Sequence, residues 1–221
     1  MRSNNIGNDK KRQVKVLCSG DVNGNFKQLI ARIALVNQKA GPFDILFCVG
    51  EFFGPDNDEN EKVINGEIDF PVPTYILGPC CPSTSTYYPA ESVEFSQSLT
   101  YLGKKGTLMT ANGLLIGYFS GIEAPAMSTQ AGPFDILFCV GEFFGPDNDE
   151  NKKVINGEID FPVPTYILGP CCPSTSTYYP AESVEFSQSL TYLGKKGTLM
   201  TANGLLIGYF SGIEAPAMST Q

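Results

Sequence analysis

The sequence predicts an α/β protein, because an apolar strand, an amphipathic helix and a second apolar strand follow one another near its start. Gln13–Gly20 alternates in polarity and then becomes apolar, which is typical of a strand that enters a buried sheet. Apolar residues from Phe26 to Val36 follow helical spacing, and Gly41-Pro42 ends that pattern. Phe43–Gly50 is a short apolar run of the kind buried on both faces of a sheet. A right-handed crossover makes the two strands parallel, and this defines the class.

Shorter elements follow these three. Thr74–Leu77 is expected to be another parallel strand, reached through an acidic, asparagine-rich loop from Asp56 to Asp69. From Leu99 onward, short apolar runs are separated by glycines and by Asn112-Gly113, a dipeptide that favours a hairpin turn. The sequence therefore predicts a sheet that begins parallel and ends in a hairpin.

A long internal repeat determines the organisation of the chain. Ala40–Gln130 recurs as Ala131–Gln221, and the copies differ only where Glu61 is replaced by Lys152. Repeats that stack as units normally diverge, so this is a duplication of part of one domain. We predict a domain at 1–130 and a duplicate at 131–221 that lacks the first strand and helix. Both copies would compete for the same docking edge, so that one copy is complete and the other poorly packed.

Composition and charge exclude some classes. The chain has 221 residues, of which 42% are hydrophobic, and no run suited to a signal peptide or a membrane span, so we expect an intracellular protein without a membrane partner. Its net charge is −8, although residues 1–39 carry eight Lys or Arg against two Asp or Glu. An acidic body makes RNA contact weak or indirect. The basic cluster of Lys10, Lys11, Arg12 and Lys15 suits RNA phosphate, an import signal or a solvated tail.

Polar residues follow each predicted parallel strand. Gly20-Asp21 and Asn23-Gly24 follow the first strand, Gly50-Glu51 the second, and Gly78-Pro79-Cys80 the third. This order resembles the metallophosphoesterase fold, in which these places read Gly-Asp-x-His-Gly, Gly-Asp and Gly-Asn-His, whose side chains hold two metals. Here Asn23 stands at the first His, Glu51 at the bridging Asp, and Cys80 near the last His.

The departures predict a degenerate site. The chain contains no histidine, so no imidazole is available as a metal ligand or as an acid for the leaving group. We therefore expect no catalytic residue, no metal and no cofactor. Two alternatives remain open. Asp21 and Glu51 could hold a single Mg²⁺ or Mn²⁺ for weak phosphodiesterase activity, or Asp21 and Asn23 could serve only a strand-to-helix turn that caps the helix.

Cysteine and aromatic pairs offer further candidates. Pro79-Cys80-Cys81-Pro82 recurs at Pro170, but adjacent cysteines rarely bind one metal, so a loop thiol pair is favoured over a zinc site. No Arg follows Cys81 closely enough to hold phosphate for a cysteine phosphatase, and the Ser- and Thr-rich segment after it is expected to be a flexible surface loop. Phe52-Phe53 suits either an exposed partner patch or burial.

Four motifs between about Val14 and Gly121 have a distinctive wording: Val-Leu-Cys-Ser-Gly-Asp-Val-x-Gly-x-Phe, Phe-Asp-Ile-Leu-Phe-Cys-Val-Gly-x-Phe-Phe-Gly, Pro-Thr-Tyr-Ile-Leu-Gly and Leu-Thr-Tyr-Leu-Gly-Lys-Lys-Gly. This wording resembles the Cwf-nineteen-like (CwfJ) family. The resemblance implies a metallophosphoesterase-like sheet with flanking helices, here partly duplicated. It also implies a nuclear, non-catalytic adaptor whose partners are the lariat-debranching enzyme and spliceosomal proteins. The chain departs from the family because the second copy stands in place of the CwfJ carboxy-terminal domains. A chain with no stable function, aggregating through unpaired strands, is a third reading.

Overall fold

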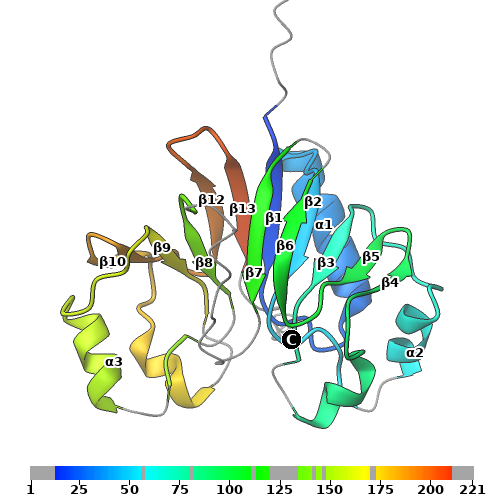
Figure 1. Ribbon diagram of the computed structural model, residues 1–221, viewed down its shortest axis with the longest axis horizontal. Helices are drawn as coiled ribbons and strands as arrows, with labels where there is room; N and C mark the ends of the chain where they lie inside the picture. The colour runs from blue at the N-terminus through cyan, green and yellow to red at the C-terminus, as the bar shows by residue number, and fades with distance from the viewer. Residues whose placement is uncertain are drawn as a thin grey trace, which may run out of the picture.

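The computed structural model describes residues 13–55, 58–79, 82–110, 113–119, 134–140, 143–145, 148–169 and 173–210 (Figure 1). It has parallel strands, antiparallel hairpins and helices in one α/β arrangement, which confirms the predicted class. The metallophosphoesterase likeness stays a prediction. Among the described residues, no helix is long and apolar enough to cross a bilayer.

The opening strand–helix–strand unit forms as predicted. Strand β1 (Lys15–Ser19), helix α1 (Phe26–Ala40) and strand β2 (Ile45–Cys48) follow one another, and the two strands pair in parallel. Helix α1 ends at Gly41, whose N–H donates to the carbonyl of Asn37, and Pro42 cannot continue the helical ladder. The Lys15 ammonium donates to the carbonyls of Ala40 (2.9 Å) and Gly41 (3.2 Å), where the helix dipole favours a cation. Lys15 therefore has a structural role within this basic cluster.

The remaining elements of the two copies correspond. In the first copy they are α2 (Asp58–Ile64), β3 (Thr74–Ile76), the 3₁₀ helix η1 (Pro82–Tyr87), β4 (Val93–Ser96), β5 (Leu99–Tyr101), β6 (Lys105–Met109) and β7 (Leu115–Phe119). In the second copy they are β8 (Leu137–Cys139), α3 (Asn148–Ile155), β9 (Thr165–Ile167), η2 (Pro173–Tyr178), β10 (Val184–Ser187), β11 (Leu190–Tyr192), β12 (Lys196–Met200) and β13 (Leu206–Phe210). Strand β8 corresponds to β2, and β13 to β7.

Helix α2 lies where the sequence predicted a loop. Of its residues only Asn60 and Val63 are buried, so no apolar stripe reveals it. Its position depends on a tertiary contact instead: the Asn60 side-chain amide donates to the Gly54 carbonyl over 2.7 Å and its Oδ1 accepts from the Gly54 N–H over 3.3 Å. Gly54 belongs to the loop after β2, and nothing in the sequence pattern connects that loop with the α2 segment.

The main sheet contains strands from both copies. Its order is β12-β13-β1-β2-β3-β5-β4, so the first strand of the chain lies between β2 of the first copy and β13 of the second. Val16 of β1 pairs with Ile45 on one side and with Ile207 on the other, both in parallel. The first-copy hairpin β6–β7 forms a separate two-stranded sheet. The sheet thus crosses the boundary predicted at residue 130, and neither copy alone supplies all of its strands.

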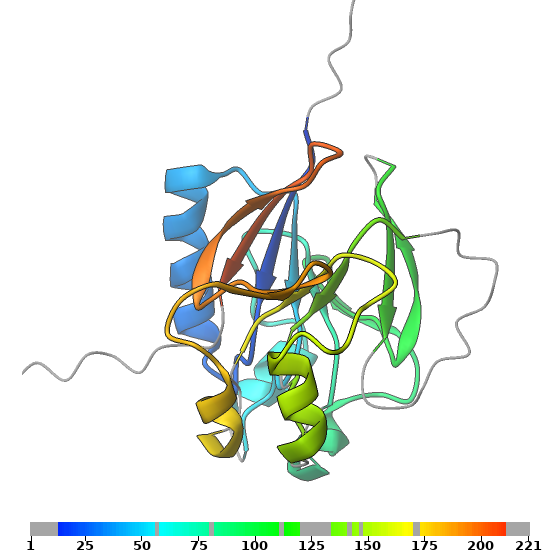
Figure 2. The ribbon, with the colours of Figure 1, turned by 90° about the vertical axis from the view of Figure 1, so that its left-hand side faces the viewer.

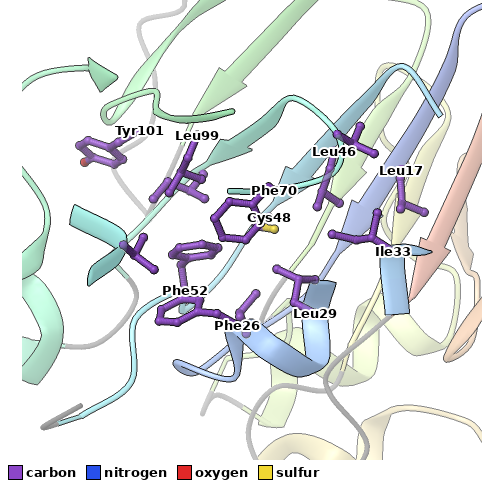
Figure 3. Packing of buried hydrophobic residues seen from close by; sticks show 14 of the residues in the cluster. Leu17, Phe26, Leu29, Ile33, Leu46, Cys48, Phe52, Phe70, Leu99 and Tyr101 are labelled. Atoms are coloured by element: carbon purple, nitrogen blue, oxygen red, sulfur yellow. The ribbon is translucent and has the colours of Figure 1, made fainter. Parts of the chain in front are cut away.

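The two faces of the main sheet are covered by different layers. Figure 3 shows Phe26, Leu29 and Ile33 of α1 packed on Leu17 and Leu46, and all three helix residues are fully buried. Burial of each such side chain contributes about 1.5–3 kcal/mol, so this face is the main source of stability for the helix. The opposite face packs against the sheet β10-β11-β9-β8 and the hairpin β6–β7, the layer on the far side of the sheet from α1 in Figure 2.

Candidate functional site

The loops after β1 and β2 meet at the carboxyl edge of the main sheet, as parallel pairing requires. The Glu51 N–H donates to Asp21 Oδ1 over 2.5 Å. In return, the N–H groups of Val22 and Asn23 donate to the Glu51 carbonyl over 2.7 and 3.0 Å. The structure therefore brings together three of the four predicted site positions, Asp21, Asn23 and Glu51, and uses the Asp21 carboxylate to hold the neighbouring loop. The fourth, Cys80, lies outside the described residues.

The side chain of Glu51 points into the protein, where it is 8% exposed. Its Oε1 accepts hydrogen bonds from the Thr84 hydroxyl (2.7 Å) and from the Tyr88 hydroxyl (3.0 Å). The Tyr88 oxygen in turn accepts from the Phe52 N–H over 3.0 Å. Burial raises the pKa of Tyr88 above its usual value, and the nearby Glu51 carboxylate raises it further. Tyr88 is therefore a neutral donor at physiological pH, and Glu51 links two loops.

Thr84 and Tyr88 were missed by the sequence analysis. They lie in or just after η1, which the sequence predicted to be a flexible surface segment because it is rich in Ser, Thr and Pro. Thr84 is nevertheless 1% exposed, so this part of the prediction was wrong. The buried carboxylate decides the outcome: Glu51 requires donors once it is removed from water, and the nearest hydroxyls come from this segment.

Asn23 shapes the strand-to-helix turn. It has a positive φ of 50° and Gly24 a φ of 74°, a left-handed pair that Asn and Gly tolerate best. Asn25 is the N-cap of α1 and makes no side-chain capping bond; its amide donates instead to the Val22 carbonyl over 3.0 Å. The predicted turn is present. The predicted capping by Asp21 or Asn23 is not, because the N-cap position is held by Asn25 and the Asp21 carboxylate accepts from the Glu51 N–H instead.

Aromatic packing fills the space beneath these loops. Phe52 and Phe53 are buried, and Phe53 stacks edge-on against Tyr88 with ring centroids 5.0 Å apart. The structure thus supports burial of this pair over an exposed partner patch. Gly50 has a φ of 98°, and a Cβ there would collide with Asp21 Oδ1, so glycine is required where the two loops touch.

The arrangement offers little to a metal ion. Within the described ranges, no three His, Cys, Asp or Glu side chains are grouped closely enough to hold one. Asp21 and Glu51 are neighbours, but both carboxylates already accept hydrogen bonds from the protein. Cations such as Mg²⁺ take six or more oxygen ligands, several of them carboxylates or water. The geometry therefore favours a rigid loop scaffold built around a buried carboxylate.

Comparison with known proteins connects this scaffold to a family. The chain is 66% identical over 112 residues to the CWF19-like protein 1 homolog of Caenorhabditis elegans, a match that covers 51% of this chain and 21% of that protein. It is 47% identical over 122 residues to the Drosophila melanogaster homolog, covering 53% and 22%. To the Homo sapiens CWF19-like protein 1 it is 39% identical over 148 residues, covering 62% and 28%. No protein-family model matches the chain.

The fold and the site define an α/β protein whose strand-end loops are joined by Asp21 and Glu51 without any histidine. The identities over about half of the chain support the CWF19-like family that its motifs predicted. It spans between a fifth and a third of the length of these relatives.

Proposed function

We propose that the protein is a non-catalytic adaptor in mRNA splicing that associates with late spliceosomes and modulates the lariat-debranching enzyme. The CWF19-like relatives point to a splicing-related role. The observation that carries the adaptor assignment is the Glu51 carboxylate, which is buried and bonded to Thr84 and Tyr88 where an active phosphoesterase would present a metal ligand. We further propose a nuclear location. We also propose only weak or indirect RNA contact, since the net charge of −8 repels phosphate.

The loops at the carboxyl edge of the main sheet are the proposed binding surface. Hydrogen bonds among Asp21, Glu51 and Tyr88 hold them in one conformation, and a preformed surface loses little entropy when it binds. Thr86 of η1 is exposed in this region. Its counterpart Thr177 is also exposed in the second copy, whose loops lack a strand and helix beside them.

A pull-down with the full chain tests this proposal. We expect the chain to capture the lariat-debranching enzyme and Thr86→Arg to reduce capture at least tenfold, because a large charge would disrupt a packed interface. Thr177→Arg is the matched control and should leave capture unchanged. Failure of the parent chain to capture the enzyme, or an equal loss with both variants, would refute the adaptor assignment or its location.

The second candidate is weak metal-dependent phosphodiesterase activity, which the contact between the Asp21 and Glu51 loops keeps open. Hydrolysis of a generic phosphodiester with Mn²⁺ present distinguishes the two. The adaptor proposal expects no turnover above the metal alone, whereas activity that disappears in Asp21→Asn would establish the enzyme instead.

A further inference from the structure

The second copy has nearly the same sequence as the first, but corresponding side chains in the two copies differ in burial. In the first copy, the apolar side chains Leu46, Cys48, Phe52, Phe70 and Val72 are all buried in one cluster with Phe26, Leu29 and Ile33 of α1. The described residues of the second copy include no counterpart of α1 beside the corresponding side chains. These are Leu137, Cys139, Phe143, Phe161 and Val163, and each is partly exposed. We call these five residues the open face.

Among the described residues, the strand that borders the open face is also unpaired on one side. Strand β8 stands at the end of the sheet β10-β11-β9-β8, whereas its counterpart β2 is bonded to β1. Gly54 of the first copy is buried, and a Cβ there would lie 2.9 Å from the Asn23 carbonyl oxygen. Gly145 of the second copy is exposed, and a Cβ there would meet no described atom within 4 Å. The second copy thus lacks both the strand pairing and the loop contact that the β1–α1 unit provides in the first copy.

A flanking contact is nevertheless conserved. Phe43 packs on Gly208 of β13, where a Cβ would also meet Leu17 of β1. In the second copy, Phe134 packs on Gly117 of β7, and the nearest atoms to a Cβ there all belong to Phe134. The hairpin β6–β7 therefore contacts Phe134 as β12–β13 contacts Phe43. What the second copy lacks is the strand and helix between them.

We propose that the open face and the β8 edge form a docking site for a strand–helix segment with the residue pattern of 13–40, supplied by a separate polypeptide. The first copy shows what this sequence binds: β2 and β8 are identical, so the pairing groups and apolar pattern that accept β1 and α1 recur at β8. The chain's own segment is held by β2 and β13. A second copy of the chain would have to break those contacts to make equal ones, so self-association gains nothing.

Fluorescence anisotropy with a labelled peptide of residues 13–40 and the full chain tests the proposal. We expect saturable binding, and at least tenfold weaker binding of a peptide carrying Leu29→Asp, which places a charge against the open face. Gly145→Ala should also weaken binding at least tenfold, because its methyl group would meet the loop after the bound strand. Its melting temperature should equal the parent's, since the methyl group meets no described atom in the free chain.

Three outcomes would overturn the proposal. Equal binding of the two peptides would show that the helix pattern is not recognised. Unchanged binding to both Gly145→Ala and Leu137→Asp would place the peptide elsewhere, such as in exchange with β1–α1 in the first copy. A concentration-dependent dimer that the peptide dissociates would show that a second copy fills the site. Leu137→Asp keeps the test decisive if Gly145→Ala disturbs the fold.

Discussion

Paired truncations at Leu46 and Leu137 test the unequal burial of the two copies. Both residues occupy the same position in identical sequences, but Leu46 is fully buried beneath α1 while Leu137 is partly exposed. Truncation of a buried leucine costs about 2–5 kcal/mol, since apolar contacts are lost and a cavity remains. A partly exposed leucine loses fewer contacts and leaves a site open to water. We expect Leu46→Ala to cost about 3 kcal/mol and Leu137→Ala about 1 kcal/mol.

Urea unfolding followed by far-ultraviolet circular dichroism measures the difference, with the slope checked for each variant. Leu35→Ala is the control, because Leu35 lies on α1 but is 56% exposed, so its truncation should shift the midpoint little. Equal costs at Leu46 and Leu137, or a larger cost at Leu137, would refute the placement of α1 on the first copy.

Three further predictions concern the main sheet. Tyr209→Cys should form a disulfide with Cys18, its neighbour on the parallel strand, under mild oxidation. Tyr118→Cys in the first-copy hairpin should form none. Peptide mapping by mass spectrometry distinguishes the two variants, and the reverse result would place β7 beside β1. Lys15→Met should lower the free energy of unfolding by about 1 kcal/mol through loss of its bonds to the end of α1, and an unchanged urea midpoint would contradict this. Burial raises the pKa of the Cys18 thiol from 9.0 to about 12. The pKa of the Cys48 thiol is also raised, mainly by burial and to a smaller extent by the nearby Cys18. The unfolded thiols lose protons first, so the free energy of unfolding should fall by up to about 1.4 kcal/mol per pH unit per thiol above pH 9. Urea midpoints from pH 8 to about 10.5 measure this, and a Cys18→Val variant that falls as steeply would argue against it.

The candidate site was predictable from the sequence in part. Asp21, Asn23 and Glu51 follow apolar strands, and parallel pairing brings them to one edge. Thr84 and Tyr88, the partners of the Glu51 side chain, carry no such pattern, because their segment has the composition of an exposed loop. Thr84 and Tyr88 bond to the Glu51 carboxylate because it is buried, and its burial depends on how the segment after β3 packs.

The sequence by itself determined the opening strand, helix and strand, the hairpins, the duplication and the family, since these follow from local periodicity, turn residues and motif wording. Only the tertiary structure decided which hairpin pairs with β1. Hairpins β6–β7 and β12–β13 have the same sequence, so their intrinsic propensities and their complementarity to β1 are equal. Local sequence therefore cannot distinguish them. The choice depends on the rest of the packing, in which β6–β7 and the second-copy sheet cover the opposite face while β13 pairs with β1 and β12 forms that edge of the sheet.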